Sequence, residues 1–252
     1  MKKFLAVHFH VFYDEFLEYY LDKLNNLSHI DCDVFVTMVS DNLKIRRVVQ
    51  EIFKNAKFFI VPNRGYDIGA FFFFLNKINF LDYKYILKIH TKNLNKKNIL
   101  KIHTKSLDKK GNIIISSKKL LTKDWVSGLI TPMLGSKQFV DDTFKFLEDN
   151  LNVTMVSGII SSDYCHYIDL LSKINANLFN LIHEQVNIFR FVPGTMFIAR
   201  SFIFYKLSHL YSIKDFEITS LSTRDGTLAH VLERGFGIIA DYYGNLKQIN
   251  RR

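Results

Sequence analysis

The chain has 252 residues, of which 48% are hydrophobic and 23% charged, and its formal net charge at pH 7 is +10. This length and composition predict a folded globular protein with a sizeable core. The basic excess favours anionic partners such as nucleotides, nucleic acid or an acidic membrane surface. Cys32 and Cys165 lie far apart in no metal-ligand spacing, so we expect a reducing compartment without disulfides.

The N-terminal sequence MKKFLAVHFHVF has the lysines and apolar run of a signal peptide, but histidines interrupt the run and no small-residue cleavage site follows. We interpret it as a strand. No stretch approaches ~18 uninterrupted apolar residues, which excludes a transmembrane helix. We therefore expect a cytoplasmic protein, free or peripheral on the inner face of the cell membrane.

The first third of the chain alternates apolar runs with helical patterns. The hydrophobic spacing predicts strands over 4–12, 33–40, 56–62 and 83–90, and helices over 13–27, 43–55 and 70–78. Such alternation is typical of a parallel sheet with helices on both faces.

The second half is less regular. It predicts two helices within 122–150, a strand over 153–160, a strand over 190–200 with a Pro-Gly break, and a helix over 225–237 that Gly235 or Gly237 closes. No linker rich in Pro, Gly or Ser divides the chain, so we expect one domain, with 161–186 as the one candidate for an inserted subregion.

Polar residues gather where the predicted strands end. Ligands of open parallel sheets bind beyond the carboxyl ends of the strands, so these residues are candidates for a binding site. They are His8, His10 and Tyr13; Asn63, Arg64, Gly65, Asp67 and Gly69; Lys88, His90, Thr91 and Lys92; and Pro193, Gly194 and Thr195.

Two of these groups allow two interpretations each. The loop NRGYDIG over 63–69 offers two glycines, an arginine and a helix start, which suits phosphate contact, but a tight turn with a solvated arginine has the same spacing. His8 and His10 lie on one face of a strand and could together bind a metal ion. No third ligand has a spacing that would complete such a site, which favours a packed or hydrogen-bonded histidine pair. The run Phe71–Phe74 predicts a helix buried on several sides.

The heptapeptide ILKIHTK occurs twice, over 86–92 and 99–105. An odd offset inverts every side chain of a strand, so the two copies cannot hold equivalent places in one strand. The first copy continues an apolar strand, whereas the second follows the polar KNLNKKN. We expect the first copy to be the structural strand. Residues 93–112 would then form an excursion, a segment rich in basic residues that leaves the domain and lies near an anionic lipid surface.

Six segments carry a family resemblance. HVFYDEF, VPNRGYDIGAF, YILKIHTK, KDW, VPGTMFIAR and DGTLAHVLERGFG follow one another in this order along nearly the whole chain. Together they resemble the rhamnan synthesis protein F family, which is implicated in bacterial surface-polysaccharide assembly. That family carries a single Lys-x-His-Thr-Lys element, so the second heptapeptide looks like a tandem insertion.

The resemblance implies a fold and an activity. The fold would be an α/β, Rossmann-like GT-A-type glycosyltransferase domain with a mostly parallel central sheet flanked by helices. It would cover 1–252, with a nucleotide-binding half over about 1–120 and an acceptor and catalytic half over about 121–252. The activity would be inverting transfer of a sugar, with rhamnose as the candidate, from a nucleoside-diphosphate donor to a glycan or lipid-linked glycan acceptor.

The resemblance also assigns site residues. Glycosyltransferases of this architecture often place an Asp-x-Asp metal site at the end of the fourth strand, where this chain has Lys88, His90 and Lys92. We expect these basic groups to neutralise the diphosphate without a metal or other cofactor, although solvated lysines at a strand end are the simpler interpretation. The remaining strand-end residues except Pro193 are expected to bind the donor.

Asp225 is the candidate general base that accepts the proton of the acceptor hydroxyl, with Glu217 and Glu233 in reserve. As a good N-cap residue it would equally serve the amides of 226–228 with no chemistry. Two other functions stay open: nucleic-acid binding, which the charge and 12 tyrosines favour but no recognition motif supports, and a non-catalytic role in a polysaccharide assembly complex. We expect no nucleic-acid partner.

Overall fold

The structure is a computed structural model that describes residues 2–94, 100–107, 113–120, 122–164, 188–219 and 227–251. The backbone alone is described for 100–107, 113–120, 163–164 and 188–189. Every structural statement below concerns these residues.

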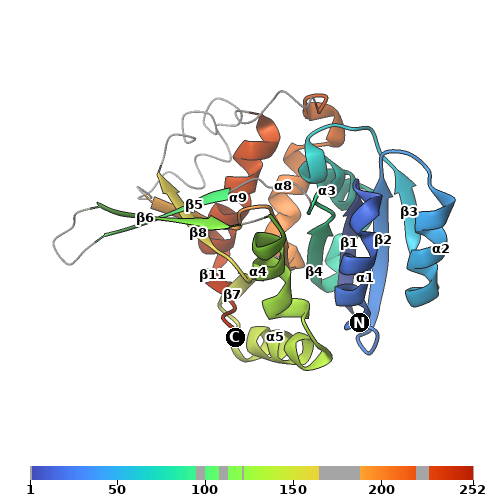
Figure 1. Ribbon diagram of the computed structural model, residues 1–252, viewed down its shortest axis with the longest axis horizontal. Coiled ribbons are helices and arrows are strands. Elements are labelled where there is room, and N and C mark those ends of the chain that lie inside the picture. Colours follow the sequence, from blue (N-terminus) through green and yellow to red (C-terminus); the bar gives the residue numbers. More distant parts are fainter. Residues whose placement is uncertain are drawn as a thin grey trace.

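A seven-stranded sheet forms the centre of the molecule (Figure 1). Its order is β11-β7-β10-β4-β1-β2-β3, and β10 alone runs antiparallel to both of its neighbours. The predicted mostly parallel central sheet is therefore confirmed. The strands are β1 (Lys3–Val11), β2 (Cys32–Met38), β3 (Lys57–Ile60), β4 (Tyr83–His90), β7 (Val153–Ser157), β10 (Phe197–Arg200) and β11 (Asn245–Gln248).

Helices cover both faces of this sheet, as the alternating pattern predicts. On one face Phe9 meets Tyr20 of α1, and on the other the neighbouring His8 meets Phe71 and Phe74 of α3. Helix α1 contacts α2 and α4, whereas α3 contacts α8 and α9. The helices are α1 (Leu17–Asn25), α2 (Leu43–Ile52), α3 (Tyr66–Lys77), α4 (Thr122–Leu134), α5 (Lys137–Asp149), α8 (Tyr205–Leu210) and α9 (Leu228–Tyr243).

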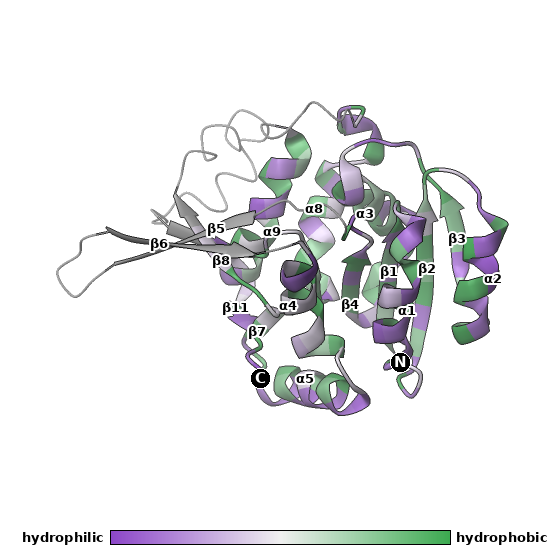
Figure 2. Cartoon of the chain, viewed as in Figure 1, coloured by the Kyte–Doolittle hydropathy of each residue, from purple (hydrophilic) through white to green (hydrophobic). Residues whose placement is uncertain are grey.

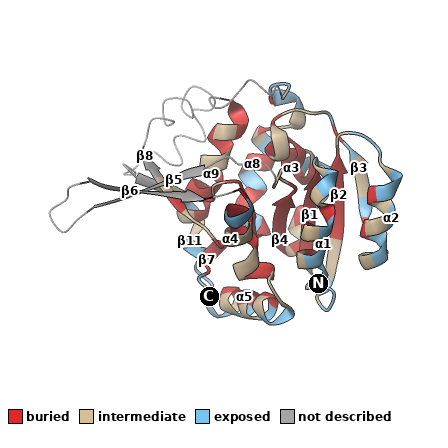
Figure 3. Ribbon diagram, viewed as in Figure 1, coloured by how far each residue is buried: buried red, intermediate tan, exposed pale blue. Residues whose placement is uncertain are grey.

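The core is richest in aromatic rings on the α3 face. Phe71 is fully buried, and its ring lies 5.2 Å from that of Phe204 and 5.7 Å from that of Phe236, both edge to face. Phe72 and Phe74 are buried as well, which confirms that the phenylalanine run belongs to an interior helix. Strands β1 and β4 are buried along most of their length (Figure 3), and hydrophobic residues dominate the centre of the sheet (Figure 2).

The two heptapeptides occupy different sheets. The first copy lies in β4, between β1 and β10, which confirms it as the structural strand. The second lies largely in β5 (Leu100–Leu107), which pairs antiparallel with β6 (Ile113–Leu120) in a hairpin that projects from the domain (Figure 1). Within the basic excursion expected over 93–112, residues 100–107 form a strand, because β6 supplies a pairing partner that the sequence did not reveal. The expected contact of this region with lipid stays a prediction.

The predicted strand over 190–200 is two strands of different sheets. Strand β9 (Ile188–Phe191) pairs with β8 (Ser161–Tyr164), and β10 joins the central sheet. Between them the chain reverses at Gly194 and Thr195, whose φ angles are 85° and 52°. The Pro-Gly break predicted an interruption, but its consequence is a change of sheet.

Two predicted helix boundaries are also wrong. Helix α3 begins at Tyr66, so Asp67 and Gly69 lie in its first turns and not in a loop. Helix α9 runs through both Gly235 and Gly237 and ends before Gly244. Gly237 is there for packing: a Cβ at this position would lie 2.0 Å from the carbonyl oxygen of Arg190. Among the described residues, none of the helices has the length and apolar character needed to cross a membrane.

The two glycines of α9 predict opposite effects of alanine. Gly237→Ala should lower the free energy of unfolding by ~1–3 kcal/mol, because the methyl group meets the rigid backbone of β9. Gly235→Ala should raise it by ~0.5–1 kcal/mol, since its Cβ would have nothing nearer than 3.8 Å and alanine favours helix. Urea unfolding of both variants measures the difference, and equal effects would contradict the close contact of α9 with β9.

Candidate active site

The carboxyl ends of β1 and β4 are joined by Thr91. Its hydroxyl accepts hydrogen bonds from the backbone amides of Phe12 at 2.9 Å and Tyr13 at 2.8 Å, and its own amide donates to the carbonyl of His10 at 3.0 Å. Thr91 is buried, with 2% of its surface exposed. It fixes the chain just before Lys92, so its described contacts are structural and its predicted contact with the donor stays a prediction.

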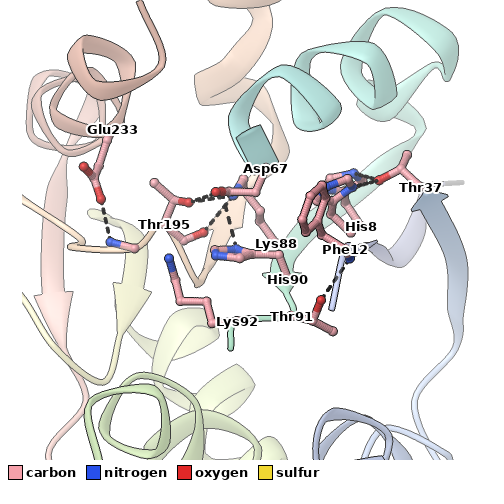
Figure 4. A network of polar contacts seen from close by, with 12 residues as sticks. His8, Phe12, Thr37, Asp67, Lys88, His90, Thr91, Lys92, Thr195 and Glu233 are labelled. Atoms are coloured by element: carbon pink, nitrogen blue, oxygen red, sulfur yellow. Dashed lines mark hydrogen bonds and ion pairs between the residues drawn. The ribbon is translucent and has the colours of Figure 1, made fainter. Parts of the chain in front are cut away.

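Lys88 is fully buried and bound to three acceptors (Figure 4). Its Nζ donates to Asp67 Oδ2 at 2.5 Å, to the Thr195 hydroxyl at 2.7 Å and to the Thr195 carbonyl at 3.1 Å. An ammonium group has three donors, and all three are used. In this arrangement Lys88 has no free N–H to offer a diphosphate, and the direct contact expected for it stays a prediction.

Asp67 receives the charge of Lys88. Burial alone would raise the pKa of the Asp67 carboxyl, but the positive charges of Lys88 and Lys92 outweigh that effect and hold the pKa well below its usual range. Burial lowers the pKa of Lys88, and Asp67 opposes this shift. The pair is thus an ionised carboxylate held by a buried ammonium, which is costly to desolvate and weak evidence of stabilisation in itself.

His8 and His10 form the predicted hydrogen-bonded pair. His8 Nε2 and His10 Nδ1 each lie 3.0 Å from the hydroxyl of Thr37 on β2. Burial lowers the pKa of His10 to about 4 and that of His8 well below its ordinary value. Both rings are neutral and belong to the floor beneath the site.

His90 is neutral for the same reason. Its side chain is 4% exposed, burial lowers its pKa well below the ordinary value, and its Nδ1 lies 3.4 Å from Asp67 Oδ2 without hydrogen-bond geometry. Neither ring nitrogen has a hydrogen-bond partner among the described residues. The positive charge available at the end of β4 is therefore that of Lys92, whose Nζ lies 4.9 Å from the centre of the Trp125 ring.

A cavity of about 210 Å³ lies beside these residues, at the carboxyl edge of the sheet. Its wall combines the start of α3, the chain after β4, the β9–β10 turn and the first turns of α9. Tyr66 and Thr195, the two described non-glycine residues with positive φ, both line it. Backbone strain of this kind concentrates at functional sites. The lining residues are Tyr66, Asp67, Ile68, Lys92, Gly194, Thr195, Ala229, His230 and Glu233.

The loop over 63–69 packs against the chain around Phe216. Arg64 donates to the carbonyl of Phe216 at 2.9 Å, and a Cβ on Gly65 would lie 2.3 Å from the Phe216 ring. A Cβ on Gly69 would lie 2.0 Å from the carbonyl of Arg64. Neither interpretation of this loop foresaw these contacts: its glycines permit close packing within the protein, and its arginine is tied to the backbone and not simply solvated.

Asn63 lies at a second cavity, of about 330 Å³, at the ends of β1, β2 and β3. Phe12 at its rim is 44% exposed, and Asp14 from the turn after β1 also lines it. Tyr13 stands between these two residues in sequence. The predicted strand-end residues thus divide between two cavities and the buried network beneath them.

The candidate base Asp225 lies outside the described residues. Its two reserves are engaged elsewhere: the Glu217 carboxylate accepts from the amide of Leu228 at 3.2 and 3.3 Å, and Glu233 accepts from the amide of Gly194 at 2.6 Å and from Arg234 at 2.8 Å. Glu217 therefore serves the α9 amide that the capping interpretation assigned to Asp225.

Sequence reasoning missed His230. It lines the first cavity, its Nδ1 lies 2.7 Å from the Thr227 hydroxyl, and its ring lies 5.6 Å from that of Tyr66. The signal was present, because Ala229, His230 and Glu233 stand at the spacing that places side chains on one helix face. Trp125 stands in the KDW segment of the family resemblance, but the sequence did not predict the contact of its ring with Lys92.

A sequence model of the family described as rhamnan synthesis protein F matches residues 1–243. The chain belongs to this family. None of the curated proteins matches the sequence. Among solved structures, the crystal structure of S. aureus TarS 1-349 is 10% identical, with a TM-score of 0.47; the match covers 100% of this chain and 59% of the TarS chain. The description of this family names the synthesis of rhamnan, a polysaccharide.

In this family member, the described residues include no group of three His, Cys, Asp or Glu side chains that could hold a metal ion. Asp67 and Glu233 both line the first cavity, but each is already bound to protein donors. The expected independence from metal stays a prediction.

The buried histidines predict a loss of stability with acid. His10 has a folded pKa of about 4 against ~6.5 unfolded, so the unfolded chain binds the proton first and stability falls as pH drops from 6.5 towards 4. Each such histidine contributes ~1.4 kcal/mol per pH unit in this window. His10→Asn should reduce the slope by about that amount in urea unfolding between pH 4.5 and 6.5.

This range separates histidines from carboxylates, because Asp67, Asp33 and Glu148 have lowered pKa values and lose their stabilisation only below ~4. His209, which is exposed on α8, provides the control substitution. An unchanged slope in His10→Asn would show that His10 titrates alike in the folded and unfolded chain.

Proposed function

We propose that this protein is an inverting, metal-independent glycosyltransferase that moves a sugar from a nucleoside-diphosphate donor to a growing bacterial surface polysaccharide. Family membership supports the polysaccharide context. The observation that carries the proposal is the first cavity, where a lysine, an ionised carboxylate and a strained turn meet at the carboxyl edge of a parallel sheet. The family's name makes rhamnose the candidate sugar.

The donor would extend across both cavities. Its nucleoside suits the cavity at the ends of β1 to β3, where the exposed ring of Phe12 offers a stacking surface and Asp14 offers acceptors for ribose hydroxyls. Its sugar suits the first cavity. Tyr13, Thr91 and Lys92 belong to the chain segments between them, so the diphosphate would lie near Lys92.

Lys92 is the residue best suited to bind the diphosphate. It is the described basic side chain of the heptapeptide that lines the cavity, because Lys88 is used by Asp67 and His90 is neutral. Its present contact with Trp125 is a cation–π contact, which keeps the ammonium near the cavity. A fixed cation at this place can stabilise the leaving diphosphate as a metal ion does in other transferases.

Donor hydrolysis tests this function. The purified protein is incubated with a panel of uridine, guanosine and thymidine diphosphate sugars, and release of the nucleoside diphosphate is followed. At least one donor should be hydrolysed, and the rate should persist in excess EDTA because Lys92 replaces the cation. Loss of all activity in EDTA with recovery in manganese or magnesium would overturn metal independence.

The second heptapeptide provides a matched control. Lys105 holds the place in that copy that Lys92 holds in the first. Lys92→Gln should slow hydrolysis ~10- to 100-fold, as loss of a charged hydrogen bond predicts, and Lys105→Gln should not. The reverse ranking would assign the diphosphate to the second copy.

Asp225 is proposed as the general base. It precedes α9, whose first turns supply Ala229 and His230 to the cavity wall, and a carboxylate in that place would accept the proton of the acceptor hydroxyl. The engagement of Glu217 and Glu233 with backbone amides supports Asp225 over both reserves, since their carboxylates are already held by donors of the protein.

Asp225→Asn separates catalysis from capping. Asparagine caps a helix about as well as aspartate but cannot take up a proton at neutral pH. The variant should keep its melting temperature and donor affinity and transfer sugar at least ~100-fold more slowly. Transfer at nearly the parental rate would leave Asp225 without a catalytic part.

A further inference from the structure

The contacts of Asp67 are all made by one oxygen. Oδ2 receives the Lys88 ammonium at 2.5 Å and the Thr195 hydroxyl at 2.6 Å, and His90 Nδ1 lies 3.4 Å from it. No hydrogen bond or ion pair joins Oδ1 to another described residue, because those of Asp67 all involve Oδ2. The side chain is 15% exposed, and Asp67 lines the first cavity.

Three elements cooperate to hold this carboxylate still. Asp67 lies in the first turn of α3, Lys88 comes from β4, and Thr195 comes from the strained turn before β10. Thr195 is 2% exposed and has a φ of 52°, so the turn accepts an unfavourable backbone conformation in order to place its hydroxyl between Lys88 and Asp67. The result is a fixed carboxylate, on a residue that lines the cavity, whose Oδ1 receives no hydrogen bond from the other described residues.

The charge of this oxygen restricts what it can bind. A carboxylate repels phosphate, so the diphosphate belongs at Lys92 and not at Asp67. It also binds a metal cation poorly here, because the Lys88 ammonium already neutralises it at 2.5 Å. A neutral group with O–H donors is the partner that remains, and the sugar of the donor is such a group.

We propose that Asp67 recognises the donor's sugar by accepting a hydrogen bond from one of its hydroxyl groups at Oδ1. This inference rests on the proposed function. Lys88 and Thr195 are then positioning residues, which act through Asp67 and do not touch the substrate. The first heptapeptide would thus help to bind both parts of the donor. Lys92 would bind the diphosphate, and Lys88 would position the Asp67 carboxylate that binds the sugar.

The experiment compares the affinity of the full chain for free nucleoside diphosphates with its affinity for their sugar conjugates, by calorimetric titration of the same uridine, guanosine and thymidine panel. Removing Asp67 alone would leave a buried, unpaired Lys88, so the test variant is Asp67→Leu/Lys88→Met, which replaces the ion pair by apolar residues of similar size. The control variant is Asp149→Leu/Lys145→Met, which removes an exposed ion pair of α5.

The test variant should bind the free nucleoside diphosphate like the parent, and its affinity for the sugar conjugate should fall ~10- to 100-fold, the effect of one charged hydrogen bond. Unchanged affinity for the conjugate would overturn the inference, as would an equal loss for both ligands. A parent chain that binds none of the panel would instead overturn the proposed function. The melting temperature of Asp67→Leu/Lys88→Met shows whether the fold is kept.

Discussion

The ion pair between Lys88 and Asp67 is the interaction on which the rest of the site depends. It joins the central strand β4 to the first turn of α3 and, through Thr195, to the turn before β10. Removing either charge would leave the other buried and unpaired, which typically costs ~3–5 kcal/mol, whereas an apolar pair of the same size would often be neutral. A fold that needed only stability would have little use for this arrangement. The pair is better explained by the position it gives to a carboxylate at the cavity.

The floor of neutral histidines is part of the same constraint. His8, His10 and His90 lie on the face of β1 and β4 that carries Lys88, and each would add a positive charge beside it if protonated. Burial keeps these rings neutral, so the charge balance beneath the cavity remains one ammonium against one carboxylate. Among the described residues that line the cavity, Lys92 is then the cation left for an anionic ligand.

The sequence predicted the elements of the sheet better than the connections between them. Apolar periodicity located β1, β2 and β4 closely, because a buried strand must be apolar along its whole length. It could not separate β9 from β10, since both strands are apolar and only the pairing partners differ. The helix end predicted at Gly237 was wrong for a related reason. In α9 this glycine permits close approach to β9, and the sequence alone does not distinguish a glycine required for packing from one that ends a helix.

The site shows the same limit. The positions of polar residues at strand ends correctly predicted which part of the fold contains the cavity. The sequence did not show that Lys88 would be buried in the core, whereas Lys92, four residues later, would line the cavity. Strand alternation alone places Lys88 and His90 on one face, and Lys92 leaves that register because β4 ends at His90. Direction relative to a neighbour such as Asp67 is a tertiary property, and two lysines of one motif acquired different roles from it.

The position of β4's carboxyl end also explains why the sheet can accommodate a second copy of the heptapeptide. Extra residues at the carboxyl end of a central strand leave its pairing with β1 and β10 intact, because the register of β4 is complete before they begin. The chain-entropy cost of lengthening a connection rises only slowly with length, so an insertion there is tolerated. The second copy lies largely in β5, which pairs with β6 in a separate two-stranded sheet. The same seven residues therefore form a buried ion-pair strand in one place and a projecting hairpin strand in the other, and what distinguishes them is the set of neighbours that each copy meets.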